Sequence, residues 1–424
     1  MTTHIKYSIV VPVFNEAYRI ESALRSLYEQ SDEEGSPLPK DFYEVIIAHS
    51  PSTDGTKEMI LGFQNAHSDF NIKIVDVAQR GLVPALIAGM NRSIDDHLFE
   101  RSSDKGPILI STHADCIHRV DWLYQLVTTL ERSHAALACS SCYYEEDDFT
   151  SRPHLWRLIK RTMDARDFIN RITGGLPEGR GYAIYASDYL DAGGLKEFYQ
   201  VSNGTFVDHC SDDMDFCTEL RALGKNIVFS ERSKVKVDSR RIDSNVGLMI
   251  QGLTYGKDGI LELTHVRDQY KRHSLEDLCE EELESLQDFT NKDFVLKYVV
   301  LPLFLSPQLF EAREMMAFLG GELAKDLSRR IHELKSEEGF PNYRMMHSWR
   351  TACYRLYFEF ASSIFARCRE KIDPDFGNVP EFPMTLKQVP KLKSRLSMRD
   401  FYYFYAEDRE SGEVHNYFGN GGVF

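Results

Sequence analysis

The stretch YSIVVPVFNE, which runs from Tyr7 to Glu16, decides the fold class of this chain. Its first seven residues form a short apolar run, which is typical of a strand buried on both faces. Asn15 follows as the expected N-cap of a helix whose apolar face begins at Ile20. A buried strand followed at once by an amphipathic helix is the start of an α/β pattern.

The same alternation of strands and helices continues as far as Cys142. Four further apolar runs predict strands, at Val45–Ala48, Ile72–Val77, Ile108–Ser111 and Leu137–Cys142. Strands that alternate with helices favour a mainly parallel sheet covered by helices on both sides. In such a sheet the ligand lies beyond the carboxyl ends of the strands. Three polar groups follow strands there, at Phe14–Glu16, His49–Asp54 and His113–Asp115.

Length and charge limit the classes of function. A chain of 424 residues exceeds the usual size of one hydrophobic core, so two structural units are expected. The net charge is −15, and no tract rich in Lys and Arg marks a nucleic-acid-binding surface. A protein this acidic needs local help to bind a phosphorylated ligand, from a divalent cation or from helix N-termini.

Nothing in the sequence predicts a membrane span. Met1–Tyr7 lacks the apolar core of a signal peptide, and no apolar stretch reaches the ~20 residues that a spanning helix needs. Val295–Leu305 comes nearest, and we expect a buried helix or loop there, with contact to a membrane surface as the alternative. Among eight scattered cysteines the one close pair, Cys139 and Cys142, lies in a predicted strand and is expected to be structural. Free thiols without a signal peptide predict a cytoplasmic protein.

Six short motifs occur in an informative order. They are VVPVFNE (Val10–Glu16), STDGT (Ser52–Thr56), RG with ALIAGMN (Arg80–Asn91), HAD (His113–Asp115), AGGL (Ala192–Leu195) and SDDMDFCTELRALG (Ser211–Gly224). With these motifs, residues 1–243 resemble the family 2 glycosyltransferases of the GT-A fold. The resemblance implies a nucleotide-sugar donor, a divalent metal ion (Mn²⁺ or Mg²⁺) and a hydroxyl acceptor of unknown identity. The Gln-x-x-Arg-Trp motif of processive members is not found, so transfer of one sugar is expected rather than polymerisation.

The resemblance assigns the metal to two carboxylates. Asp115 stands where the family has the last carboxylate of its Asp-x-Asp motif, and such a ligand neutralises the charge that builds on a leaving diphosphate. The alternative is a turn-forming or helix-capping Asp. Asp238 follows a predicted strand, Val235–Val237, and is the second candidate ligand. Arg240 in the same turn resembles a basic turn near the diphosphate, whose fork suits phosphate oxygens; a surface turn is the alternative.

Two departures from the family pattern concern the donor's nucleotide. His113 stands where relatives usually have Asp, and is expected either to contact the metal or ribose or to be a tolerated substitution. His49 and Ser50 replace the carboxylates that contact the base in relatives. Loss of an acceptor for a base N–H should change base preference or affinity, so uracil is not assumed. The other donor-binding residues implied by the resemblance are Pro12, Phe14, Glu16, Asp54, Arg80, Gly81 and Ala114.

Acidic residues at the start of a predicted helix are the candidate general base. Asp213, and after it Asp212, match the family's Glu-Asp motif, whose carboxylate serves as base in inverting members. Inversion requires a carboxylate that takes the proton of the acceptor hydroxyl as its oxygen attacks from the opposite face. The alternative is that these residues only favour the N-terminus of the helix.

The remaining segments are less informative. The Gly-rich stretch from Gly174 to Gly181 lacks the setting of a dinucleotide or phosphate loop. We expect a loop over the acceptor site, with Arg180 as a contact to the diphosphate or the acceptor, or else an ordinary surface loop. Residues 244–370 predict a helical domain, and 371–424 a Pro-rich connector and an aromatic tail. The sequence does not indicate the acceptor or the oligomeric state.

Two other functions compete with sugar transfer. The first is a catalytically inactive GT-A-like binding or scaffolding subunit, which His49, Ser50 and His113 suggest. The second is nucleotidyl transfer onto a sugar phosphate, which normally needs a Gly-rich basic loop after the first strand. Because Phe14-Asn15-Glu16 stands in that place, nucleotidyl transfer ranks last.

Overall fold

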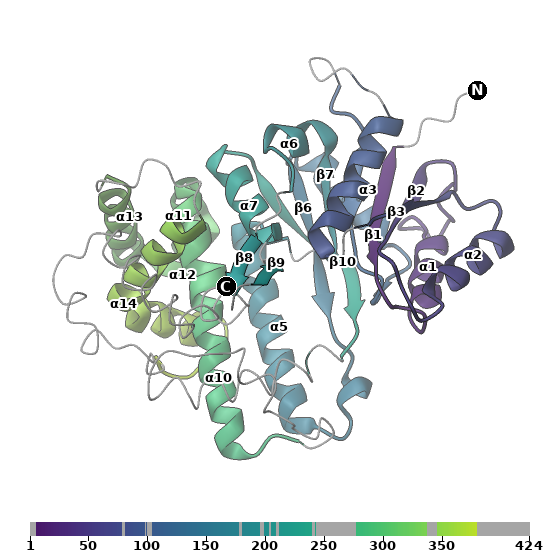
Figure 1. Cartoon of the computed structure of the whole chain (residues 1–424). Helices are drawn as coiled ribbons and strands as arrows, with labels where there is room; N and C mark the ends of the chain where they lie inside the picture. Colours follow the sequence, from purple (N-terminus) through teal and green to yellow (C-terminus); the bar gives the residue numbers. More distant parts are fainter. Residues whose placement is uncertain are drawn as a thin grey trace. The chain divides into compact units, whose positions relative to one another are not determined.

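The computed structural model (Figure 1) describes residues 6–78, 81–97, 99, 104–177, 180–195, 199–202, 205–208, 212–239, 242, 277–336 and 346–379. The chain divides into two compact units. Unit 1 consists of residues 1–144, 174–198 and 212–238, and unit 2 of residues 145–173, 199–211 and 239–424. The division predicted at residue 243 stays a prediction.

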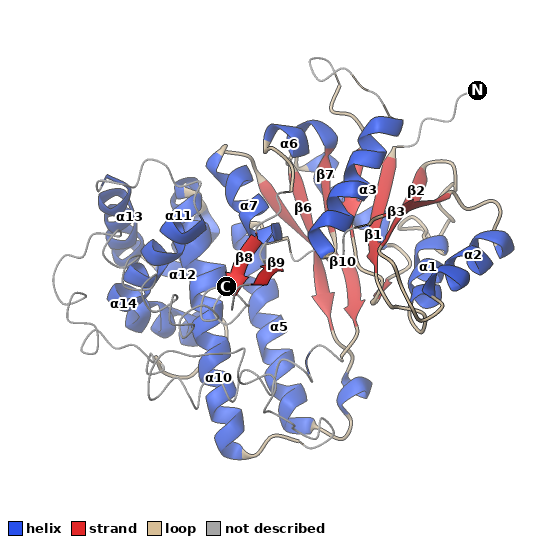
Figure 2. Cartoon of the chain, viewed as in Figure 1, coloured by secondary structure: helices blue, strands red, loops and turns tan. Residues whose placement is uncertain are grey.

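Unit 1 is built on an eight-stranded sheet in the order β3-β2-β1-β4-β7-β6-β10-β5 (Figure 2). The strands are β1 (Tyr7–Val13), β2 (Tyr43–His49), β3 (Ile72–Asp76), β4 (Ile108–Ser111), β5 (Cys116–His118), β6 (Leu137–Tyr143), β7 (Tyr182–Tyr185) and β10 (Ile227–Val237). β1 to β4 pair in parallel, as do β6 and β10, whereas β7 runs antiparallel to both its neighbours and β5 runs antiparallel to β10. The predicted α/β architecture with a mostly parallel sheet is confirmed.

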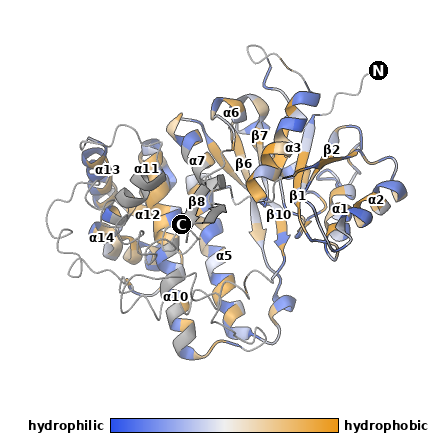
Figure 3. Cartoon of the chain, in the orientation of Figure 1, coloured by the Kyte–Doolittle hydropathy of each residue, from blue (hydrophilic) through white to orange (hydrophobic). Residues whose placement is uncertain are grey.

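Helices cover both faces of this sheet because side chains alternate along each strand. Ile9 and Val11 on β1 belong to the larger core cluster, which also contains residues of α1, α2 and α4. Val10 faces the opposite side, where Gly89 of α3 comes so close that a Cβ there would lie 2.3 Å from Val10 Cγ1. The helices of unit 1 are α1 (Ile20–Tyr28), α2 (Thr56–Ala66), α3 (Leu82–Asp96), α4 (Trp122–Arg132), α6 (Ala186–Asp191) and α7 (Asp212–Ala222). The apolar residues concentrate on the strands (Figure 3).

The first helix begins later than the sequence predicts. Arg19 occupies the N-cap position of α1 and makes no side-chain cap, so Asn15 is not the N-cap. Asn15 instead adopts the left-handed conformation, with φ of 54°. Asn tolerates this conformation better than most residues because its short polar side chain bonds locally. The backbone therefore turns at residue 15, before the helix starts.

Unit 2 is mainly helical, which confirms the predicted helical C-terminal region. Its elements are η1 (Glu146–Phe149), α5 (Pro153–Thr173), β8 (Tyr199–Ser202), β9 (Thr205–Asp208), α10 (Glu280–Phe294), η2 (Val295–Val300), α11 (Leu301–Leu305), η3 (Pro307–Glu311), α12 (Arg313–Leu319), α13 (Gly321–Ser336) and α14 (Met346–Lys371). Of the predicted tail at 371–424, residues 380–424 lie outside the described residues.

The apolar stretch Val295–Leu305 lies in the core of unit 2, as predicted. Every residue in it is buried except Lys297, which is half-buried. It begins with a π-helical turn, η2, just before Pro302 at the start of α11. Proline has no N–H to donate, and a wider turn before it accommodates the lost hydrogen bond. None of the helices that the structure describes is long and apolar enough to cross a membrane.

Candidate active site

Three strands end side by side at one edge of the sheet in unit 1. Val13 of β1 stands opposite His49 of β2, and Val10 stands opposite Ser111 of β4. The pairing continues past the strands, because the Ser50 N–H donates to the carbonyl oxygen of Val13 at 2.9 Å. The residues that follow β1, β2 and β4 are thereby brought to one edge, as the sequence predicts for a ligand site.

Hydrogen bonds join two of these segments, the one after β1 and the one after β2. The Asn15 side chain accepts a hydrogen bond from the Thr53 N–H at 2.9 Å, and the Asn15 N–H donates to Ser52 Oγ at 3.1 Å. The Glu16 N–H donates to Thr56 Oγ1 at 2.9 Å. Asp54 accepts from the Ala17 N–H at 3.1 Å. Hydrogen bonds from the Thr56 side chain and from backbone N–H groups lower the pKa of Asp54. Asp54 therefore acts as a charged anchor between the two loops.

Asp115 is a buried carboxylate beyond the end of β4. Its side chain is 1% exposed, and Nδ1 of His113 lies 4.0 Å from Asp115 Oδ1. Burial, and next the Asp115 charge, raise the pKa of the Cys116 thiol, which stays protonated and points at Asp115 Oδ1 over 3.7 Å. A buried carboxylate is costly unless a cation compensates it. A divalent metal held there would supply that compensation.

Asp238 lies next to Asp115 because β5 pairs with β10. The backbone N–H of Asp238 is 3.3 Å from the carbonyl oxygen of Asp115. The Asp238 carboxylate, however, forms an ion pair with Arg19, whose guanidinium also lies 3.8 Å from Glu16 Oε2. A metal ion that used Asp238 would have to displace Arg19. The sequence analysis missed Arg19, which stands 219 residues before its partner.

The residues present fit a metal ion whose coordination shell is completed by oxygen atoms of the substrate. Within the part of the chain that is described, no three His, Cys, Asp or Glu side chains are grouped to hold a metal ion by themselves. Mg²⁺ in phosphoryl-handling enzymes typically binds one or two carboxylates together with phosphate oxygens of the substrate. Asp115, with His113 beside it, offers that incomplete set.

Most other predicted donor contacts lie along the same edge. Phe14 and Pro12 are half-buried at the end of β1, and Ala114 is buried between His113 and Asp115. Gly81 precedes α3 with φ of 143°, a conformation that favours glycine. Arg80 and Arg240 lie outside the described residues, and Asp212 and Asp213 begin α7, where only the backbone is described.

His49 is oriented by a charged partner. Its Nδ1 lies 3.1 Å from Asp76 Oδ1, and Lys57 holds both oxygens of Asp76 at 2.8 and 2.9 Å. The hydrogen bond from Lys57 is the main reason that the pKa of Asp76 lies below its ordinary value, so Asp76 accepts the Nδ1 proton of His49. When Nδ1 alone carries a proton, Nε2 is a hydrogen-bond acceptor, and this buried atom has no partner among the described residues. The carboxylates are absent from positions 49 and 50, but an acceptor atom is present.

A third histidine, His118, which the sequence analysis did not single out, holds the backbone next to this site in place. His118 is buried against the Trp122 ring, with Nδ1 at 2.9 Å from Ser26 Oγ and Nε2 at 2.7 Å from Thr112 Oγ1. Burial lowers the pKa of His118 to about 3, so its ring is neutral at physiological pH. Thr112 directly precedes His113. The pair Ser26 and His118 therefore holds the backbone that leads into the segment His113–Asp115.

We expect this buried ring to make stability depend on pH. The unfolded chain protonates His118 near the ordinary pKa of 6.5, whereas the folded chain does so only at about 3. Its contribution is complete above pH 6.5 and is lost as the pH falls, with a slope of up to about 1.4 kcal/mol per pH unit. The melting temperature of the wild type should fall more steeply than that of His118→Gln between neutral and mildly acidic pH. Parallel curves would show that His118 does not titrate on unfolding.

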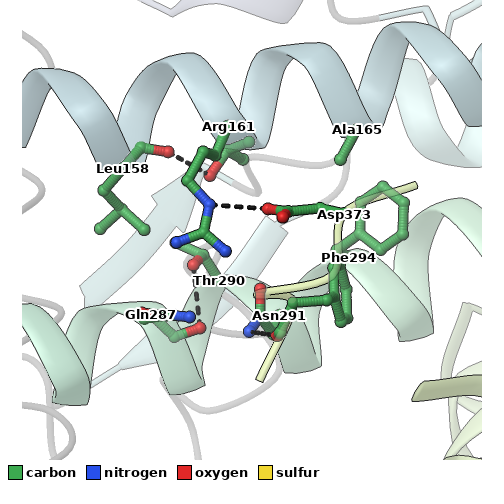
Figure 4. Close-up of a pocket in the computed structure, with 10 residues that line it drawn as sticks. Leu158, Arg161, Ala165, Gln287, Thr290, Asn291, Phe294 and Asp373 are labelled. Atoms are coloured by element: carbon green, nitrogen blue, oxygen red, sulfur yellow. Dashed lines mark hydrogen bonds and ion pairs between the residues drawn. The ribbon is translucent and has the colours of Figure 1, made fainter. Parts of the chain in front are cut away.

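A pocket in unit 2 does not compete with this edge as a substrate site. Figure 4 shows it between α5 and α10, where Arg161 Nε bonds Asp373 at 2.7 Å and Gln287 donates to the carbonyl oxygen of Asp375 at 3.1 Å. Its volume of about 20 Å³ is room for one water molecule and not for a sugar. The polar groups of this pocket form hydrogen bonds that hold the segment following α14 in place.

Several known proteins are similar to parts of this chain. A glycosyltransferase of Haloferax volcanii, AglE, is 31% identical over 131 residues, which is 31% of this chain and 37% of that protein. The uncharacterized glycosyltransferase YfnE of Bacillus subtilis is 24% identical over 222 residues, 52% of this chain and 46% of that protein. The chain thus matches less than half the length of these relatives. A solved mannosyltransferase of Pyrobaculum calidifontis, in complex with GDP-Man and Mn²⁺, has a TM-score of 0.42 and 18% identity over 84% of this chain and 87% of its own.

The family described as glycosyl transferase family 2 matches residues 8–186. This range contains β1 to β4, the loops that Asn15 and Asp54 fasten, and the HAD segment with Asp115. Three of the six motifs that suggested the family, VVPVFNE, STDGT and HAD, thus lie in the segments that the sheet brings to one edge. Over residues 8–186 the chain is similar to glycosyl transferase family 2.

Proposed function

We propose that this protein transfers one sugar from a nucleotide-sugar donor to an acceptor hydroxyl with the help of a divalent metal ion, with inversion at the anomeric carbon. The observation that carries the proposal is the buried Asp115 carboxylate beside His113, at the edge where β1, β2 and β4 end. Buried charge at that place supports a site for a cation and an anionic ligand.

Each group has a role in this scheme. Asp115 would hold Mn²⁺ or Mg²⁺, which when bound neutralises the charge on the leaving diphosphate. The acceptor oxygen attacks the anomeric carbon while the bond from that carbon to the diphosphate oxygen breaks and its electron pair leaves with the diphosphate. Asp213, or in its place Asp212, takes the proton of the acceptor hydroxyl. The loops that Asn15 and Asp54 hold together form a rigid floor for the nucleotide.

The experiment is direct detection of nucleoside diphosphate release. Purified full-length protein is incubated with UDP-, GDP-, dTDP- and ADP-sugars in Mn²⁺ or Mg²⁺, with and without chelator. We expect slow release from the donors of one base, dependent on the metal. Release that persists in chelator would refute the metal role, and no release from any donor would count against the enzyme.

The pair His49 and Asp76 should set which base is accepted. If Nε2 of His49 accepts a hydrogen bond from the ring edge of the base, it favours uracil and thymine, which have N3–H there, and guanine, which has N1–H, over adenine and cytosine, whose ring nitrogens at that edge are acceptors. We expect His49→Ala to weaken binding of the preferred nucleoside diphosphate about 5- to 10-fold. Asp76→Asn, which no longer holds the tautomer, should weaken it less. Calorimetric titration measures both, with the exposed Asp69→Asn as the control. Unchanged affinity in His49→Ala would place the base elsewhere.

A further inference from the structure

Arg180 stands at a fixed point of the backbone just before β7. Thr112 Oγ1 donates to the carbonyl oxygen of Arg180 at 3.2 Å, and the Ser140 N–H donates to the carbonyl oxygen of Gly181 at 2.7 Å. Gly181 also packs so tightly that an added Cβ would lie 2.6 Å from Ser140 Oγ. Thr112 is itself fixed by His118. The loop is therefore tied to β4 and β6 at the place where Arg180 emerges.

Within the described part of the chain, the guanidinium of Arg180 forms no ion pair. The side chain is half-buried, its Nε is buried, and within the described residues the guanidinium makes no hydrogen bond or ion pair. Two other arginines of unit 1 have partners: Arg19 pairs with Asp238, and Arg221 donates through Nη2 to the carbonyl oxygen of Gly175 at 2.9 Å, although its Nε is also buried without a partner among the described residues. An arginine that loses hydration without gaining a partner costs stability. Such a residue is retained more readily where a ligand completes it.

Arg180 lies beside the segment that carries Asp115, because its carbonyl oxygen accepts the hydrogen bond from Thr112, three residues before Asp115. Burial acts to lower the pKa of Arg180, but the titratable groups around it, among them the Asp115 carboxylate, outweigh burial and raise this pKa. A metal ion on Asp115 would place a second positive charge beside the guanidinium. Two cations so close repel each other unless an anion lies between them.

We propose that Arg180 binds a phosphate group, shared with the metal held by Asp115. The inference rests on the proposed function and names a further residue of that site. The planar fork of arginine bonds two phosphate oxygens at once, which an ammonium cannot do. The phosphate has two sources, the donor's diphosphate and a phosphate carried by the acceptor. Because Arg180 lies near the metal-binding carboxylate, the donor's diphosphate is the occupant that the geometry favours.

The test is calorimetric binding of pyrophosphate and of methyl phosphate, each with Mn²⁺, to the full-length protein. We expect Arg180→Met to weaken pyrophosphate binding about 10- to 100-fold, since a hydrogen bond to a charged group is lost. Arg180→Lys, which keeps the charge but not the fork, should recover part of the loss. Arg132→Met, at the exposed end of α4, is the matched control and should bind as the wild type does.

The outcomes are distinct. Loss of pyrophosphate binding in Arg180→Met assigns the donor's diphosphate, and loss of methyl phosphate binding alone assigns a phosphate on the acceptor. If the wild type binds neither probe, or Arg180→Met binds both as the wild type does, the proposal is overturned. A role in folding predicts a lower melting temperature for Arg180→Met without ligand, whereas removal of an uncompensated charge should leave it unchanged or higher. Because no sugar is transferred, this result stands apart from the activity test.

Discussion

Replacing Asp115 with Asn should lower sugar transfer about 10²- to 10³-fold and remove its dependence on Mn²⁺. The carboxylate is buried at the edge where the strands end, with His113 beside it. Asn keeps the shape and the turn-forming ability but cannot neutralise a cation. Transfer is measured as nucleoside diphosphate release over a Mn²⁺ titration.

The control for this variant is Asp121→Asn. Asp121 lies at the N-cap of α4, and its carboxylate is bonded by Arg119 and Gln125 rather than placed at the ligand edge. The Asp121→Asn variant should change the melting temperature slightly and give the same Mn²⁺ titration as the wild type. If Asp115 were only a turn former, Asp115→Asn would behave in the same way. A wild-type Mn²⁺ response in Asp115→Asn would therefore rule out its role as metal ligand.

Replacing Asp213 with Asn should lower transfer about 10²- to 10⁴-fold without affecting nucleotide binding. A general base acts on the acceptor's proton in the transition state and contributes little to holding the donor. Asp213 lies in the first turn of α7. The measurement is the rate of transfer to the acceptor together with the affinity for the nucleoside diphosphate.

Asp212→Asn is the matched variant, because it changes the neighbouring carboxylate by the same single group. A large rate loss in Asp212→Asn with a small one in Asp213→Asn would move the base to Asp212. If both variants transfer sugar at the wild-type rate, these residues serve only the N-terminus of the helix. Weaker nucleotide binding in either would contradict a role confined to proton transfer.

The sequence predicted the elements that local pattern determines. β1, β2 and β4 are apolar runs that stay buried on both faces, and such runs are visible without a structure. β5 and β7 were not foreseen because they have three and four residues and pair antiparallel with strands far along the chain. The assignment of Asn15 as N-cap was wrong for the same reason, since its partners Ser52 and Thr53 lie in another loop.

The sequence predicted which residues belong to the candidate site, but not the hydrogen bonds and ion pairs that hold them in place. His49, His113 and Asp115 were identified because they follow predicted strands, and the strand register brings their segments to one edge. The support of His118 by Ser26 spans 92 residues, and the pairing of Arg19 with Asp238 spans 219. No local pattern encodes such contacts. The relay from Asp76 to His49, which restores an acceptor where the carboxylates are missing, depends on the pairing of β2 with β3.

The most direct test of a metal-dependent nucleotide-sugar site is the melting temperature of the protein with UDP, GDP, dTDP, ADP and CMP, each with and without Mn²⁺. A ligand that binds only the folded state raises the melting temperature by mass action. We predict that one nucleoside diphosphate whose base has a ring N–H (uracil, thymine or guanine) raises the melting temperature in Mn²⁺, and that the shift is lost in chelator and in Asp115→Asn. If no nucleotide shifts the melting temperature under either condition, the account is contradicted and an inactive binding subunit with this fold explains the chain better.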